Sequence, residues 1–284
     1  MRRLKVIGGL AWLAVWVAVD GALGQDPGPA RGTPIGTGRV RVEFDKASGS
    51  LRMQSGGRQF AVARFAEPGR ATSTVEKVGA ETPFGPGWML KIGPSRTGIL
   101  PVSENRVLVR DGSPWVLIRR DGRTLPATRG NRVEAIEAVL DLGADPAKLK
   151  GLGPGGLFDP AKNPGQHVVT AIADPASGAG VVAGLVRIDA ASGVLLTKVE
   201  GGKVVLTLRN DYGSVVPPQL EPFGGDWWAL GWFDDARDGL ESYAGEFARL
   251  SAIKLKPAPV GFMTWYSEKY GQAKATLCWQ HRYP

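Results

Sequence analysis

Four aspartates near the end of the chain are the side chains whose type and spacing could perform acid–base chemistry. A carboxylate pair could be drawn from Asp226, Asp234, Asp235 and Asp238, and paired carboxylates can act as general acid and general base. A structural role accounts for them better. Asp234 or Asp235 can cap the start of a helix, and Asp238 is then a first-turn acid stabilised by the helix dipole. We therefore expect no catalytic residue in this group.

Other chemistries have weaker support. His167 and His281 lie far apart and have no second ligand at helical or hairpin spacing, which argues against a metal site. No Gly-x-Ser-x-Gly nucleophile elbow is present. The glycine-rich stretch Gly151–Leu157 lacks the Gly-Lys-Ser/Thr of a phosphate loop, and Pro154 and Pro160 disfavour a following helix. We expect a tight connection or bulge there, and neither a metal nor another cofactor.

Three tryptophans crowd one predicted strand, Trp227, Trp228 and Trp232. Alternation along a strand places Trp228 and Trp232 on one face and Trp227 on the other. Exposed indoles could form a carbohydrate-binding patch, because sugar rings stack on them. Aromatic residues that face a second sheet are more often core. Both interpretations stand at this point.

Bulk properties exclude some classes of partner. The net charge is +8, but basic residues are interspersed with acidic ones, and no basic stripe with interleaved aromatics is present. We expect no nucleic-acid partner. Cys278 is the only cysteine, so no intrachain disulfide can form.

The first residues have the pattern of a signal peptide. A basic start, Met1–Lys5, precedes the apolar run Val6–Val19, and Ala22-Leu-Gly24 supplies small residues before a cleavage point at Gln25. The alternative is a membrane anchor, but a span needs about 20 apolar residues, more than this run contains. We predict a signal peptide over 1–24, a periplasmic or extracellular location without a membrane segment after cleavage, and a flexible lead-in over 25–38.

Most of the chain predicts β-structure. Forty glycines and 21 prolines suit many short strands joined by turns. The segment 132–142 also fits a helical period, but its β-rich neighbours need pairing partners, so we predict it to be extended. We predict an antiparallel sandwich over residues 39–233. Its strand candidates are Val40–Phe44, Leu51–Met53, Gln59–Phe65, Trp88–Ile92, Arg106–Arg110, Trp115–Arg119, Arg132–Leu142, His167–Ala173, Gly180–Ile188, Val194–Glu200, Lys203–Arg209 and Asp226–Phe233.

The hydrophobic period changes after the sandwich. Leu240, Tyr243, Ala244 and Phe247 fall at i, i+3, i+4 and i+7, which predicts one helix. We assign 234–256 to a connecting helix and linker. Prolines at 257 and 259 terminate this segment.

The order of elements resembles the melibiase-type α-galactosidases. The helix reads Gly239-Leu-Glu-Ser-Tyr-Ala244, and a Pro-rich link leads to Pro259-Val-Gly-Phe-Met-Thr-Trp-Tyr266. In that family a β-supersandwich precedes a (β/α)₈ barrel, and the link and first barrel strand read Pro-x-Gly-Trp-x-Ser-Trp-Tyr. Here Phe262 and Thr264 replace Trp and Ser. The resemblance covers about residues 40–272 and is specific only in this last stretch.

The resemblance implies a sugar contact at Trp265 and Tyr266, since in the family the aromatic end of the first barrel strand lines the pocket. The alternative is that both are core aromatics of a short strand. The family's two catalytic aspartates lie on later barrel strands, beyond this sequence. We therefore expect the first strand of a truncated barrel over 257–274 and an aberrant tail over 275–284.

The fold expected is mainly β: a large antiparallel β-supersandwich, one C-terminal helix, and the first strand of an incomplete barrel. The function implied is that of a fragment of an exported carbohydrate-active protein whose intact relatives hydrolyse α-galactosides, with a galactoside-like carbohydrate as partner and no activity in this chain. The alternative is a non-catalytic module that binds glycan or mediates protein contacts.

Overall fold

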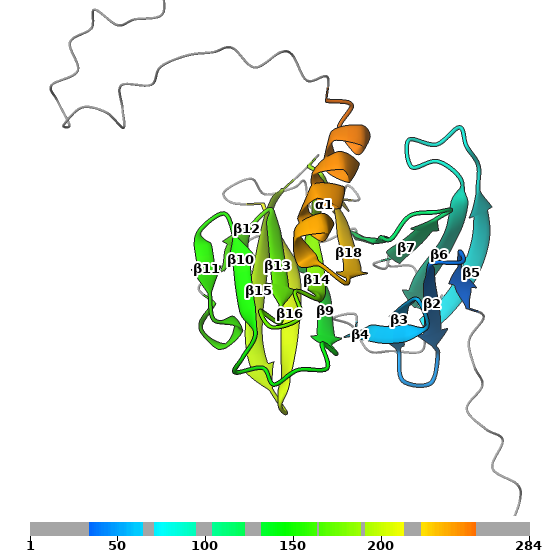
Figure 1. Ribbon diagram of the computed structural model, residues 1–284. Helices are drawn as coiled ribbons and strands as arrows, with labels where there is room; N and C mark the ends of the chain where they lie inside the picture. The colour runs from blue at the N-terminus through cyan, green and yellow to red at the C-terminus, as the bar shows by residue number, and fades with distance from the viewer. Residues whose placement is uncertain are drawn as a thin grey trace, which may run out of the picture.

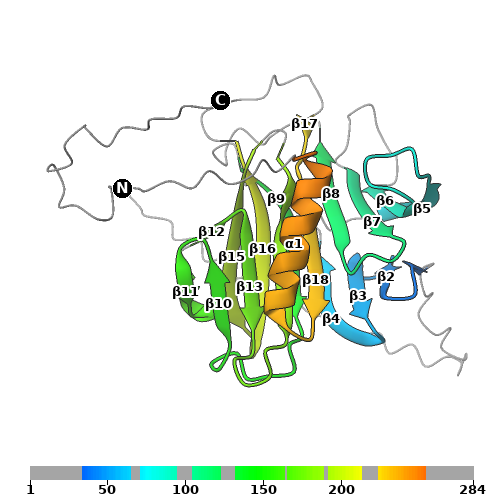
Figure 2. The same ribbon diagram turned by 45° about the horizontal axis from the view of Figure 1, so that its top comes forward.

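A computed structural model of the chain describes residues 34–64, 71–94, 104–122, 132–163, 165–188, 191–212 and 223–253. Two large antiparallel β-sheets pack face to face, and one α-helix lies on the outer face of the second sheet (Figures 1 and 2). The predicted mainly β fold is confirmed, and within the described residues one α-helix follows the sandwich. The segments 257–274 and 275–284, predicted as a barrel strand and a tail, lie outside the described residues.

The first sheet contains eight strands within the part of the chain that the structure describes. In spatial order they are β1 (Ile35–Gly36), β2 (Val40–Asp45), β3 (Ser50–Ser55), β4 (Arg58–Arg64), β9 (Arg132–Leu140), β16 (Lys203–Asp211), β15 (Ser192–Glu200) and β12 (Gln166–His167). The ambiguous segment at 132–142 is therefore a strand. It pairs with β4 on one side and β16 on the other, so pairing with both neighbours outweighs its helical period.

The second sheet carries the helix. In spatial order its strands are β11 (Gly156–Phe158), β10 (Lys150–Gly153), β13 (Val169–Ala173), β14 (Gly180–Arg187), β18 (Trp227–Phe233), β8 (Val116–Gly122), β7 (Glu104–Arg110), β6 (Gly87–Pro94) and β5 (Ala71–Val78); β17 (Phe223–Gly224) pairs with β8. The glycine-rich stretch at 151–157 forms the β10–β11 hairpin, which confirms the predicted tight connection. A short 3-10 helix, η2 (Pro160–Lys162), follows.

Alternating side chains build the core between the sheets. On β2 the apolar residues Val40, Val42 and Phe44 are buried and the residues between them are not. This period of two directs one face of each strand inward. The inter-sheet cluster receives residues from both sheets, and a second cluster fills the space between the second sheet and the helix.

Two details of the sandwich differ from the prediction. The stretch 167–173 is not one strand: His167 ends β12 in the first sheet, and Val169 begins β13 in the second. Val168, between them, has φ 67°, so the backbone turns there from one sheet to the other. The predicted flexible lead-in also ends earlier than Gly38, because Ile35 is buried and pairs with Val42.

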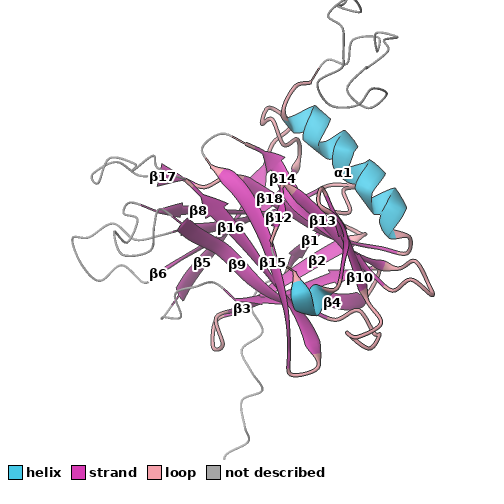
Figure 3. Cartoon of the chain, turned by 90° about the vertical axis from the view of Figure 1, so that its left-hand side faces the viewer, coloured by secondary structure: helices cyan, strands magenta, loops and turns pink. Residues whose placement is uncertain are grey.

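The helix α1 spans Ala236–Leu250 and lies along β14, with further contacts to β18 and β13. Figure 3 shows it running along the outside of the strands. It begins where the Ala236 N–H donates to the carbonyl of Gly178, in the β13–β14 turn, and it ends at the opposite end of the sandwich. Among the described residues no helix combines the length and apolarity that a membrane span requires.

Candidate functional site

The residues that the sequence assigned to sugar contact, Trp265 and Tyr266, lie outside the described residues, as does His281. His167 is exposed at the end of the short strand β12. No cluster of His, Cys, Asp or Glu that could hold a metal ion occurs in the ranges that the structure describes.

The four candidate aspartates do not form a catalytic pair. Asp226 is fully buried before β18, where its carboxylate accepts a hydrogen bond from the Ala191 N–H at 2.8 Å. Asp234 and Asp235 follow the other end of this strand, which at ~3.3 Å per residue places them more than about 25 Å from Asp226. Retaining glycosidases need their carboxyl groups about 5 Å apart. The arrangement therefore excludes a pair of this kind between Asp226 and the two later aspartates.

Asp235 and Asp238 belong to the start of the helix, whereas Asp234 accepts a hydrogen bond from Trp232 Nε1 at 3.4 Å. Asp235 is the N-cap residue, and its side chain accepts a hydrogen bond from the Arg237 N–H at 2.9 Å. The Arg237 side chain also bonds this carboxylate, and this contact, followed by the backbone bond, lowers the pKa of Asp235 to about 2. Asp238 is an exposed acid of the first turn. The structural interpretation of these carboxylates is confirmed.

The tryptophans are core residues. Trp228 and Trp232 belong to the cluster between the sheets and Trp227 to the cluster beneath the helix, as the alternation predicted. All three are at most 6% exposed. The Arg58 guanidinium lies 4.0 Å from the centre of the Trp232 ring. None of these three indoles offers an open face for a sugar ring.

A buried polar cluster that sequence reasoning missed closes one end of the inter-sheet space. Asn210, from the first sheet, is fully buried and accepts a hydrogen bond from Trp228 Nε1, of the second sheet, at 2.9 Å. Tyr212 lies beside it, and burial raises the pKa of its hydroxyl to about 12. A buried hydrogen bond between two packed sheets helps to fix how one sheet lies on the other. The only signal in the sequence was a polar pair, Asn210 and Asp211, at the end of an alternating strand.

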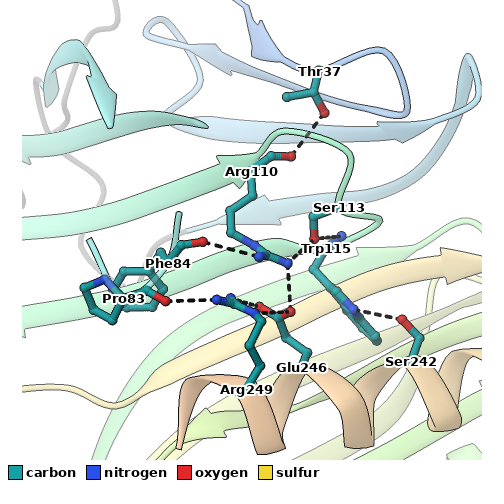
Figure 4. Close-up of polar contacts among 9 residues, drawn as sticks. All are labelled: Thr37, Pro83, Phe84, Arg110, Ser113, Trp115, Ser242, Glu246 and Arg249. Carbon is teal, nitrogen blue, oxygen red and sulfur yellow. Dashed lines mark hydrogen bonds and ion pairs between the residues drawn. The ribbon is translucent and has the colours of Figure 1, made fainter. Parts of the chain in front are cut away.

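A polar network joins α1 to the second sheet (Figure 4). Glu246 is 6% exposed, and its carboxylate lies 2.7 Å from the guanidinium of Arg110 on β7. Arg249, one turn further along the helix, bonds the same carboxylate at 2.9 Å and the carbonyl of Pro83 at 2.9 Å. Because the pair is mostly buried, the loss of one partner would leave an uncompensated charge.

Two further contacts fix the helix along its length. Trp115 Nε1 donates to the Ser242 hydroxyl at 3.2 Å (Figure 4). The Tyr243 hydroxyl donates to the carbonyl of Leu185 on β14, and burial raises the pKa of this phenol. The helix is therefore held at a defined position on the sheet. The backbone after Leu250 accordingly leaves the sandwich at a fixed place.

These features define a class: a two-sheet β-sandwich with a C-terminal helix fixed on its outer face, and no catalytic or metal-binding constellation among its described residues. No family model matches the chain, and no curated protein matches it in sequence.

Solved structures show where such a sandwich occurs. The chain is similar to the alpha-N-acetylgalactosaminidase NagBb from Bifidobacterium bifidum in complex with GalNAc, with 12% identity and a TM-score of 0.51, over 75% of this chain and 38% of that one. An alpha-mannosidase from Enterococcus faecalis V583 gives a TM-score of 0.44 at 11% identity, over 82% of this chain and 32% of that one. The chain thus spans 38% of the length of the first of these proteins. The predicted β-sandwich fold is therefore shared with part of this glycoside hydrolase.

Proposed function

We propose that this chain is the non-catalytic β-sandwich part of an exported glycoside hydrolase of the α-galactosidase type, whose catalytic carboxylates are supplied by a (β/α)₈ barrel. In this proposal the sandwich and α1 form a rigid base, and the segment after Leu250 leads into the barrel. The substrate class is an α-galactoside or a related glycoside. The chain by itself has no turnover.

One observation carries the proposal: the shared fold with a glycoside hydrolase, of which this chain spans 38%. The fixed helix adds support. A linker that starts from an element held by a buried ion pair can place a following domain reproducibly, whereas a mobile linker cannot. The separation of Asp226 from Asp234 and Asp235 agrees with chemistry that takes place elsewhere.

Export and the galactoside substrate rest on the sequence. The basic start and apolar run before Gln25 support a signal peptide. The stretch from Pro259 to Tyr266 supports the α-galactosidase type. An aromatic residue at the end of a first barrel strand would face the site, because barrel enzymes build their sites at the C-terminal ends of the strands.

A second function remains a candidate, namely a free-standing module that binds glycan or contacts another protein. The two proposals differ in what the gene encodes next. We expect the DNA beyond codon 284, read in all three frames, to encode Asp-bearing strands that alternate with segments of helical period. Downstream DNA without such a pattern in any frame would refute the hydrolase proposal and leave the free-standing module.

A further inference from the structure

A cavity of about 260 Å³ opens at the end of the sandwich where α1 begins. It lies between the β9–β10 connection and the β15–β16 hairpin. The chain continues past α1 at the opposite end of the sandwich, so this cavity is distant from the place where a following barrel would attach.

The floor of the cavity is apolar and rigid. Its side chains are at most 8% exposed, and all belong to the cluster between the two sheets: Leu140, Leu142, Leu149 and Val204. Because protein cores are close-packed, these four side chains hold their positions without a ligand. Such a floor suits the C–H face of a small molecule.

Two side chains of opposite charge stand at the mouth. Lys203 Nζ lies 3.2 Å from the Asp141 carboxylate, and both side chains are nearly half exposed, at 48% and 45%. An ion pair this exposed stabilises a fold by only ~0–1 kcal/mol. It does, however, place a strong donor and a strong acceptor next to one another above an apolar floor.

Backbone contacts hold this mouth in place. The Asp141 N–H donates to the carbonyl of Phe60 at 2.8 Å, and the Asp141 carbonyl accepts from Arg58 Nη2 at 3.5 Å. The same Arg58 guanidinium lies 4.0 Å from the centre of the Trp232 ring. The acceptor Asp141 is therefore held by β4, whose Arg58 packs against Trp232 of β18, and the donor Lys203 is the first residue of β16.

We propose that this cavity binds the pyranose ring of a neutral sugar as a non-catalytic subsite. Adjacent donor and acceptor groups match neighbouring hydroxyls, and the aliphatic floor matches the C–H face of the ring. The opposite charges cancel, which favours a neutral ligand over an anion or a cation. The cavity is smaller than the ~300–1,000 Å³ of drug-sized sites, so it admits one ring. This subsite does not depend on a catalytic barrel.

The test is direct binding of sugars to the full chain, measured by saturation-transfer NMR and isothermal titration calorimetry. The probes are D-galactose, N-acetyl-D-galactosamine and D-mannose, with D-glucuronate as an anionic comparison. We expect saturable binding of at least one neutral sugar, and weaker binding of D-glucuronate. No saturable binding of any neutral probe, or tighter binding of D-glucuronate, would overturn the proposal.

Two substitutions locate the site. Lys203→Met keeps the aliphatic stem and removes the donor, and Asp141→Asn removes the charge of the acceptor. Each should weaken binding about tenfold, the usual effect of losing a charge-assisted hydrogen bond. Lys91→Met is the matched control, because Lys91 on β6 forms a similar exposed ion pair with Glu76 on β5.

Lys91→Met should leave sugar affinity unchanged. Unaltered binding in both Lys203→Met and Asp141→Asn would place the sugar elsewhere and contradict the assignment. Thermal unfolding of each variant checks that its fold is intact. Since the assay measures binding and not turnover, its result is independent of whether the chain belongs to a hydrolase.

Discussion

The carboxylate of Glu246 on α1 lies 2.7 Å from the guanidinium of Arg110 on β7, across 136 residues of sequence. Burial lowers the pKa of Arg110, and the neighbouring Glu246 carboxylate opposes this effect. This contact joins the last described helix to a strand from the first half of the chain. Together with the hydrogen bonds of Ser242, Tyr243 and Arg249, it holds α1 at one position on the sandwich.

Glu246→Gln should destabilise the fold by about 3 kcal/mol, because it leaves the half-buried Arg110 without its counter-charge. The measurement is the urea midpoint of unfolding at neutral pH. Glu241→Gln is the control, since Glu241 is an exposed residue of the same helix. An equal effect of the two substitutions would mean that the Arg110–Glu246 pair does not fix the helix.

Gly239→Ala should destabilise the protein, although alanine is the better helix former. A Cβ at Gly239 would lie 2.7 Å from atoms of Phe233 and Val182, whereas a Cβ at Gly245 would meet nothing within 4 Å. Gly245→Ala should therefore stabilise the protein by about 1 kcal/mol. Both midpoints can be measured in one denaturant series. Stabilisation by both substitutions would show that the helix does not approach the sheet this closely.

Acid should remove the contribution of the helix cap. The pKa of Asp235 is about 2 in the folded chain and about 3.9 when unfolded. Its stabilising effect is therefore fully present above pH ~4 and is lost as pH falls towards 2. Asn caps helices without titrating, so Asp235→Asn should flatten this part of the stability profile. An identical profile for the variant and the parent protein would contradict the assignment.

Alkali should destabilise the protein through two buried phenols. The pKa of Tyr212 is raised to about 12, and that of Tyr243 is raised as well, both mainly by burial. Unfolded tyrosine ionises near ~10, so their contribution is intact below pH ~10 and is lost as pH rises above it. Urea midpoints from pH 8 to 11 measure this loss. Tyr243→Phe should reduce the slope of the urea midpoint against pH. An unchanged slope would mean that ionisation of the Tyr243 phenol does not contribute to the loss of stability.

Local patterns in the sequence were enough to predict most elements. The alternation at 203–209 and the helical period at 240–247 reflect which face of an element is buried, so both could be predicted. The strand β5, with the sequence Ala-Thr-Ser-Thr-Val-Glu-Lys-Val, was missed because it lies at the edge of its sheet and has a mostly polar surface. The crossover at Val168 was missed because both of its sides read as extended.

Contacts between distant residues could not be predicted. Neither Arg110 nor Glu246 differs from an ordinary surface residue in its local sequence, and only the fold makes them partners. The same holds for Asn210 and Trp228, which come from different sheets. The cavity at Asp141 and Lys203 likewise exists only because two connections converge at one end of the sandwich.

The central claim is that this chain is the non-catalytic part of a glycoside hydrolase, and a turnover assay tests it most directly. Purified chain is incubated with chromogenic α-galactoside and α-N-acetylgalactosaminide substrates. We expect no release of chromophore above the blank. The account would be contradicted by measurable turnover that is abolished by a single substitution within residues 25–284, such as Asp226→Asn.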